Sequence, residues 1–263
     1  MKERWLYCEG QSDAPVLKAV FAALAIDAIP ESTGGNPAEI ARWQHENGVA
    51  AASISDRDYR SLADCDASYN VGSVKFLWRR HSIENYLLEP VVVSKTIENI
   101  KHSLQAMPHP PACTENLPEN NINAIKNDLV EAGKQIIRKE CGCLCIHNLW
   151  VDLRESLGRI QQRIPCIFTS GNNTTEEECV TALKAEVSRL VSAASEASIA
   201  QDLQEAEIAA RYATRIAQMQ QESYWQDMTF LHEFHGKRLL RELRQQLDKS
   251  YGFHPPSELF FKS

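Results

Sequence analysis

Long hydrophobic runs are missing from this chain of 263 residues. No stretch approaches the length of about 18 apolar residues that a membrane-spanning helix needs, and the opening MKERWLYCEG holds no apolar signal core with a cleavage site. We therefore expect a cytoplasmic protein that does not associate with membranes. A composition of 43% hydrophobic and 24% charged residues is typical of a globular protein with a buried core.

Positive charge is also scarce. The 28 Lys and Arg residues are outnumbered by 35 Asp and Glu residues, which gives a net charge of −7. Non-specific affinity for nucleic acids comes mostly from Lys and Arg side chains that neutralise phosphates. A nucleic-acid enzyme with this balance needs a local basic patch, bound metal ions, or a partner that presents the substrate.

The eight cysteines lack the two separated C-x-x-C pairs that most structural zinc sites use. Six residues are candidate metal ligands: a C-x-C-x-C cluster, the histidine that follows it and two later cysteines. In order, they are Cys141, Cys143, Cys145, His147, Cys166 and Cys179. Their spacing fits no zinc template, so we expect reduced thiols and keep a metal site as the less favoured alternative. Cys8 lies inside an apolar run and is expected to be a small core residue.

Alternating strand and helix patterns fill the first third of the chain. They predict strands at 4–8, 27–32, 49–55 and 73–78, and helices at 13–25, 37–47 and from Ser82 to a stop at Pro90. Strands that alternate with helices imply a parallel sheet with right-handed crossovers. Functional sites in such sheets form at the carboxyl ends of the strands.

The rest of the chain is mainly helical in pattern. Residues 94–148 are expected to be helical, apart from a Pro- and Asn-rich loop at 107–121. Residues 175–220 are expected to form a helical hairpin, with Thr174 or Thr175 as its cap. Residues 229–247 are expected to form a short strand, a His-Gly-Lys turn and a final helix.

Acidic residues follow two of the predicted strands. Glu9 and Asp13 lie in WLYCEGQSD, and Asp56 and Asp58 lie in SISDRDYR. Mg²⁺ and Mn²⁺ prefer oxygen ligands, and gathered carboxylates are costly unless a cation compensates them. This pattern indicates a divalent-metal site that acts on phosphate. The alternatives are a solvated D-x-D turn and, for Asp13, a helix cap.

These motifs in this frame resemble a TOPRIM domain, the fold shared by primases, type II topoisomerases, recombination mediators and OLD-family nucleases. Two further segments, RRHSIENYLLEP and HGKRLL, resemble the OLD-like nuclease branch and contribute Glu84 and Lys237. The resemblance implies a Rossmann-like α/β fold with a parallel sheet and a mainly helical insertion. It implies a TOPRIM core at 1–93, an insertion at 94–227 and a C-terminal segment at 228–263 that completes the core.

The activity implied by the resemblance is Mg²⁺- or Mn²⁺-dependent phosphodiester hydrolysis. The implied metal ligands are Glu9, Asp13, Asp56, Asp58 and Glu84. Lys237 would stabilise the charge that develops on the phosphate, and Glu9 could act as a general acid or base. As alternatives, Glu84 could be an ordinary residue of a first helical turn and Lys237 an ordinary surface residue. Arg79 and Arg80 could contact phosphate or be ordinary surface charges.

Relatives of the OLD type usually carry an ATPase domain, but this sequence contains no G-x-x-x-x-G-K-[ST] phosphate loop. It is similar to the stand-alone TOPRIM effector of the two-component PARIS anti-phage system. That similarity implies a toxin-like nuclease that cleaves host tRNA and is controlled by a separate ABC-type ATPase. A homodimer is expected separately, because two-fold dimers are the commonest oligomers. A DNA endonuclease or nickase of the OLD type and a catalytically inert TOPRIM scaffold remain alternatives.

Overall fold

The computed structural model describes residues 3–34, 36–57, 62–70, 73–118, 121–152, 175–193, 205–253 and 255. Spatial contacts divide the chain into two units, one of residues 1–129 with 231–263 and one of residues 130–230. These units are groups of residues in contact and do not test the domain boundaries expected from the TOPRIM resemblance. The ranges 1–93, 94–227 and 228–263 therefore stay a prediction.

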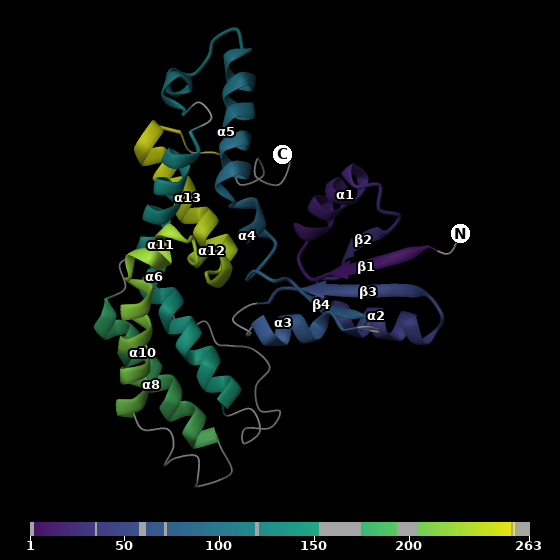
Figure 1. The fold of residues 1–263 in the computed structure, drawn as a ribbon, viewed down its shortest axis with the longest axis vertical. Coiled ribbons are helices and arrows are strands. Elements are labelled where there is room, and N and C mark those ends of the chain that lie inside the picture. The colour runs from purple at the N-terminus through teal and green to yellow at the C-terminus, as the bar shows by residue number, and fades with distance from the viewer. Residues whose placement is uncertain are drawn as a thin grey trace. The chain divides into compact units, whose positions relative to one another are not determined.

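The first unit contains a parallel β-sheet, so the predicted α/β class is confirmed. Its strands are β1 (Arg4–Cys8), β2 (Ile29–Ser32), β3 (Ala50–Ser55) and β4 (Lys75–Leu77), in the order β2-β1-β3-β4 (Figure 1). Leu6 of β1 pairs with Pro30 on one side and Ala52 on the other. The carboxyl ends of β1 and β3 are therefore neighbours.

Helices cover both faces of this sheet. In Figure 1, α1 (Asp13–Ala23) lies on one side of the sheet, and α2 (Pro37–Glu46) and α3 (Leu62–Ser68) lie on the other. Cys8 and Ile54 join the core on the α1 side, whereas Tyr7 and Ala51 join the core that includes Ala41 of α2. Successive residues of a strand point to opposite faces of the sheet, so β1 and β3 each contribute side chains to both cores.

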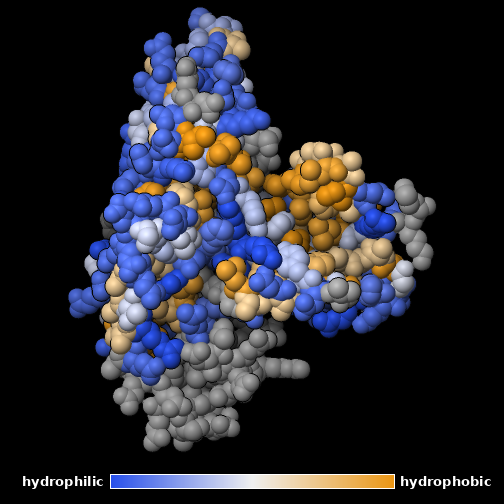
Figure 2. Space-filling view, viewed as in Figure 1, coloured by the Kyte–Doolittle hydropathy of each residue, from blue (hydrophilic) through white to orange (hydrophobic). Residues whose placement is uncertain are grey.

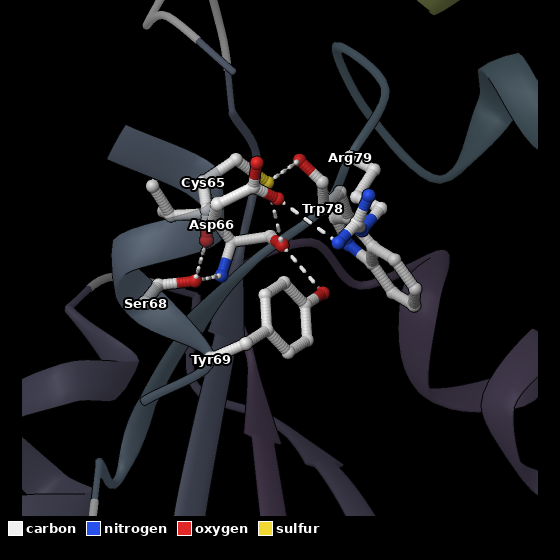
Figure 3. A network of polar contacts seen from close by, with 7 residues as sticks. Cys65, Asp66, Ser68, Tyr69, Trp78 and Arg79 are labelled. Carbon is white, nitrogen blue, oxygen red and sulfur yellow. Dashed lines mark hydrogen bonds and ion pairs between the residues drawn. The ribbon is translucent and has the colours of Figure 1, made fainter. Parts of the chain in front are cut away.

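The short helix α3 was missed by the sequence patterns, which placed β4 directly after β3. Cys65 is its one buried residue, so seven residues offer almost no apolar periodicity to detect. Tertiary contacts hold α3 to the edge strand (Figure 3). Cys65 and Tyr69 donate hydrogen bonds to the Leu77 carbonyl at 3.4 Å and 2.7 Å, and the Leu77 N–H donates to Ser68 at 3.1 Å. These bonds occupy backbone groups that an edge strand otherwise leaves open.

Helices follow the sheet in the first unit. They are α4 (Glu84–Leu87), α5 (Pro90–Gln105), the short 3-10 helix η1 (Ala112–Asn116), the start of α6 (Ile122–Asp152), most of α12 (Phe230–Glu233) and α13 (Gly236–Tyr251). The helix predicted to stop at Pro90 ends earlier, at Leu87, and Pro90 itself begins α5, because proline suits a first helical turn. The strand expected near residue 230 is wrong, since this segment is helical.

The second unit is helical among the residues described. It holds most of α6, then α8 (Glu176–Ala193), α10 (Glu205–Met219) and α11 (Glu222–Gln226). Helices α8 and α10 contact each other, as the predicted hairpin requires. Thr175 caps α8 through a reciprocal pair, in which the Glu178 N–H donates to the threonine hydroxyl at 3.2 Å and the Thr175 N–H donates to the glutamate at 2.7 Å. Thr174 lies outside the described residues.

The cysteine cluster lies in the interior of this helical unit. Cys141, Cys143, Cys145 and Cys179 are buried free thiols, and the Cys141 thiol lies 3.8 Å from the Tyr212 carbonyl oxygen. Cys166 lies outside the described residues. The buried Cys8 in β1 is a core residue, as expected.

The surface around α1 is unusually apolar. Figure 2 shows hydrophobic side chains gathered over this part of the first unit, and Val20, Leu24, Ile26 and Ile29 are the exposed large residues there. None of the helices that the structure describes is long and apolar enough to cross a membrane.

Candidate functional site

The loop after β1 is folded around its own aspartate. The Gly10 N–H donates to the Asp13 carboxylate at 3.2 Å, and the Asp13 N–H donates back to the Gly10 carbonyl at 3.1 Å. A side chain on Gly10 would place its Cβ 2.7 Å from an Asp13 oxygen, so any other residue there would displace the Asp13 carboxylate. The spacing of E-G-Q-S-D thus turns the Asp13 carboxylate inward at the start of α1.

Asp13 and Glu84 form a pair of buried carboxylates at this place. Asp13 is 3% exposed and Glu84 is 1% exposed, although they come from different segments. Burial raises the pKa of Asp13 above its ordinary value, and the nearby charge of Glu84 raises this pKa further, whereas the Gly10 hydrogen bond and Lys237 oppose the shift. Two acids held together away from water are the environment that a cation stabilises.

Glu84 has no hydrogen-bond donor among the residues that the structure describes, although both of its oxygens are buried. Lys237 makes an ionic contact with Glu84, in which its Nζ lies 3.6 Å from a Glu84 oxygen while the lysine side chain stays 57% exposed. A buried carboxylate is costly unless it is paired and hydrogen-bonded. The Glu84 oxygens are therefore available to bind a metal ion or to accept a hydrogen bond from a substrate.

The contact between Glu84 and Lys237 depends on a close approach of two helices. Gly236 opens α13 against the residues of α4, where an added Cβ would lie 2.6 Å from the Ser82 hydroxyl and 2.8 Å from the Glu84 Cβ. Glycine lets the first turn of α13 reach the buried glutamate. The H-G-K pattern is explained by this packing, and it brings Lys237 from the far end of the sequence to Glu84.

The other predicted site residues follow the strands but are placed differently. Glu9 comes directly after β1 and is exposed, and Asp56 comes directly after β3 and is half-buried. Asp58 lies outside the described residues. Within the described ranges, no three His, Cys, Asp or Glu side chains lie close enough together to hold a metal ion. The structure thus brings Asp13, Glu84 and Lys237 together, and the five-carboxylate metal set stays a prediction.

The two neighbouring arginines have separate environments. Arg79 is exposed, pairs with the exposed Asp66 at 2.9 Å, and lies over the Tyr69 ring (Figure 3). Arg80 is 12% exposed, donates to the Asn85 carbonyl at 2.7 Å and forms an ion pair with Glu89. Arg80 is therefore a structural residue, whereas Arg79 remains accessible to solvent.

Sequence reasoning missed two buried polar residues beside the acids. Arg57 is the middle residue of D-R-D, and Asn85 directly follows Glu84. Both are buried, and both donate hydrogen bonds to backbone carbonyls of the segment that precedes Lys237. Their position inside the acidic motifs was the available signal.

An apolar hollow of about 450 Å³ lies elsewhere in the first unit. It is lined mainly by residues near the amino ends of β1 and β3, including Trp5, Leu6, Ala50 and Ala52, with Phe21 of α1. Arg4 and His45 also border the hollow, but apolar side chains make up most of its lining. The acids lie at the opposite, carboxyl edge of the sheet.

In comparisons with known proteins, no family model matches this chain, and no curated protein sequence matches it. The case for function therefore depends on the residues and their arrangement.

Proposed function

We propose that this chain is a metal-dependent nuclease of the TOPRIM type, with Glu84 at the centre of its active site. The observation that carries the proposal is the buried Glu84 carboxylate, which has a second buried acid, Asp13, and a lysine beside it. Three sequence segments that resemble TOPRIM motifs supply these residues. A purely structural glutamate would be expected to have hydrogen-bond donors.

The residues present fit a divalent cation in part. Asp13 and Glu84 would hold it, with Asp56 and the undescribed Asp58 as further oxygen donors from the end of β3. Bound Mg²⁺ or Mn²⁺ would activate water and neutralise charge on a phosphodiester. Lys237, exposed at its tip, would contact the phosphate. Glu9 is exposed to solvent, where it could exchange protons as a general acid or base.

The resemblance extends the proposal to a biological role. It favours a toxin-like effector of anti-phage defence that cleaves host tRNA and is restrained by a separate ABC-type ATPase, and a homodimer is proposed because two-fold dimers are the commonest oligomers. The net charge of −7 supports the need for a partner or metal ions, since the chain has little general attraction for nucleic acid.

An inert TOPRIM scaffold is the second candidate. It is favoured by the absence, within the described ranges, of three metal-ligating side chains gathered in one place. In that case the buried acids would be a relic of an active ancestor, and the surface would act by recruiting partners.

Cleavage assays with purified protein separate these functions. Plasmid DNA and total tRNA are incubated with the protein and Mg²⁺ or Mn²⁺, with EDTA as the control. We expect metal-dependent tRNA fragments that Glu84→Gln abolishes, whereas Glu131→Gln, the same change at an exposed carboxylate paired with Lys134, leaves cleavage intact.

The other outcomes identify the alternatives. Nicking of plasmid without tRNA cleavage would support a DNA nuclease of the OLD type. The enzyme proposal fails if neither substrate is cut and if Glu9→Ala and Asp56→Ala leave cellular toxicity unchanged. That result would leave the scaffold.

A further inference from the structure

The chain segment before Lys237 is held by two hydrogen bonds, one from the loop after β3 and one from α4, together called the grip. Arg57, just after β3, donates a hydrogen bond from its guanidinium to the carbonyl of His232. Asn85, which follows β4, donates from its amide to the carbonyl of Phe234 at 2.9 Å. Arg57 is 6% exposed and Asn85 is fully buried at 0%, so water competes little with these bonds.

The orientation of the Asn85 amide is determined by its surroundings. Its oxygen accepts from the Ser82 N–H at 3.0 Å and from the Ser82 hydroxyl at 2.9 Å. The oxygen therefore faces Ser82, and the NH₂ group faces the Phe234 carbonyl. All of these bonds are buried, so losing any one leaves an unsatisfied polar group.

Both hydrogen bonds of the grip are accepted by backbone carbonyls, so they hold this segment regardless of which side chains it carries. Two residues beyond Phe234, Gly236 packs against Ser82, Glu84 and Asn85. Lys237 then lies 3.6 Å from the Glu84 carboxylate. Because Glu84 and Asn85 are adjacent in α4, the turn that presents the acid also fastens the segment that presents the lysine.

We infer that Asn85, assisted by Arg57, is a positioning residue that holds Lys237 opposite Glu84. The assignment of Lys237 to catalysis rests on the proposed function, but the grip itself does not. Asn85 acts through Lys237 and does not contact the substrate. Its loss would let the start of α13 move away from Glu84.

Hydrogen exchange tests the grip without any activity assay. The amides of Arg238 and Leu239 both donate to the His235 carbonyl at 3.0 Å, so their exchange reports on the first turn of α13. In Asn85→Ala we expect exchange roughly tenfold faster at these amides, since a buried carbonyl loses its donor. Arg57→Met removes the other hydrogen bond of the grip, the one to the His232 carbonyl. It keeps the test valid even if Asn85→Ala does not fold.

A matched control comes from the other end of α13. Asp128 accepts hydrogen bonds from Ser250 at 2.9 Å and Tyr251 at 2.8 Å, and it thereby ties the last turn of this helix. Asp128→Asn should lower stability but leave exchange at Arg238 and Leu239 unchanged. Unchanged exchange in both grip variants, or equal acceleration in Asp128→Asn, overturns the inference.

Kinetics test whether the grip acts through the lysine. We expect Lys237→Met to slow single-turnover cleavage about 10²-fold or more, and Asn85→Ala about tenfold. The double variant should be no slower than Lys237→Met alone, because a positioning residue has nothing left to position. Multiplied effects would refute the positioning role. Faster exchange in Asn85→Ala and Arg57→Met, together with a wild-type protein that cuts no substrate, would uphold the grip and refute the proposed function.

Discussion

Gly236→Ala is the single-methyl change that tests the packing of the candidate site most directly. The new Cβ would lie 2.6 Å from the Ser82 hydroxyl, 2.7 Å from the Asn85 side-chain oxygen and 2.8 Å from the Glu84 Cβ. Real Cβ atoms essentially never approach other atoms this closely. The start of α13 must therefore move away from α4, or the buried Asn85 must give up its hydrogen bonds.

Two opposing effects set the size of the change. Alanine is a better helix former than glycine by about 0.8–1.0 kcal/mol in a helix interior, and by less at the first helical residue. Inserting a methyl group into a packed core costs about 1–3 kcal/mol. The clash involves three atoms, and one of them, the Glu84 Cβ, is bonded to the backbone and cannot rotate away. We therefore expect the energy cost of the clash to exceed the gain in helix propensity. The net loss in the free energy of unfolding is about 1–2 kcal/mol.

Urea titration and thermal melting measure this loss, which corresponds to about 2–4 °C in Tm for each kcal/mol in a protein of this size. Cleavage should fall together with stability, since Lys237 is displaced from Glu84. Gly133→Ala is the matched control, because its Cβ would lie 2.9 Å from the Trp225 ring in the other unit. It should lower stability without impairing cleavage by the folded protein. A Gly236→Ala protein as stable as the wild type would refute the reasoning.

Three other predictions follow from buried or paired groups. Burial raises the pKa of Asp13 above its ordinary value of 3.8. The folded protein therefore keeps a proton on Asp13 at pH values where the unfolded chain has released it. Across those pH values, the contribution of Asp13 to the free energy of unfolding falls as the pH rises. Asp13→Asn should therefore raise that free energy more near pH 7 than near pH 4 in urea titrations, and an equal gain at both would contradict the cause. Arg80→Ala should cost about 1–3 kcal/mol because it removes a partly buried ion pair and a partly buried hydrogen bond. Arg79→Ala, at an exposed ion pair, should cost under about 1 kcal/mol. Equal melting temperatures of the two variants would contradict this contrast. Thr175→Ala should lower the helix content and Tm of the chain by removing the cap of α8, a loss of about 0.5–2 kcal/mol that circular dichroism can follow.

Most of the strand and helix order of the first unit could be predicted because most of its elements carry their own pattern. The strand predicted at 4–8 coincides with β1, and the parallel sheet follows from the alternation of elements. Helix α3 was missed, since a helix with a single buried residue has almost no pattern and is held by contacts with β4. Residue 230 was assigned to a strand because a short apolar run fits a strand and a helix equally well.

The sequence by itself indicated the acids of E-G-x-S-D and D-x-D as site candidates, because their chemistry is local to each motif, whereas Glu84 and Lys237 became candidates through the resemblance to OLD-like nucleases. Only the tertiary structure decided that Asp13 is buried while Glu9 is exposed, and that Lys237 meets Glu84. The physical reason is that the burial of a charge depends on what packs over it. Lys237 comes from α13, which the chain reaches only at its end, and the buried Arg57 and Asn85 bond to the His232 and Phe234 carbonyls just before that helix.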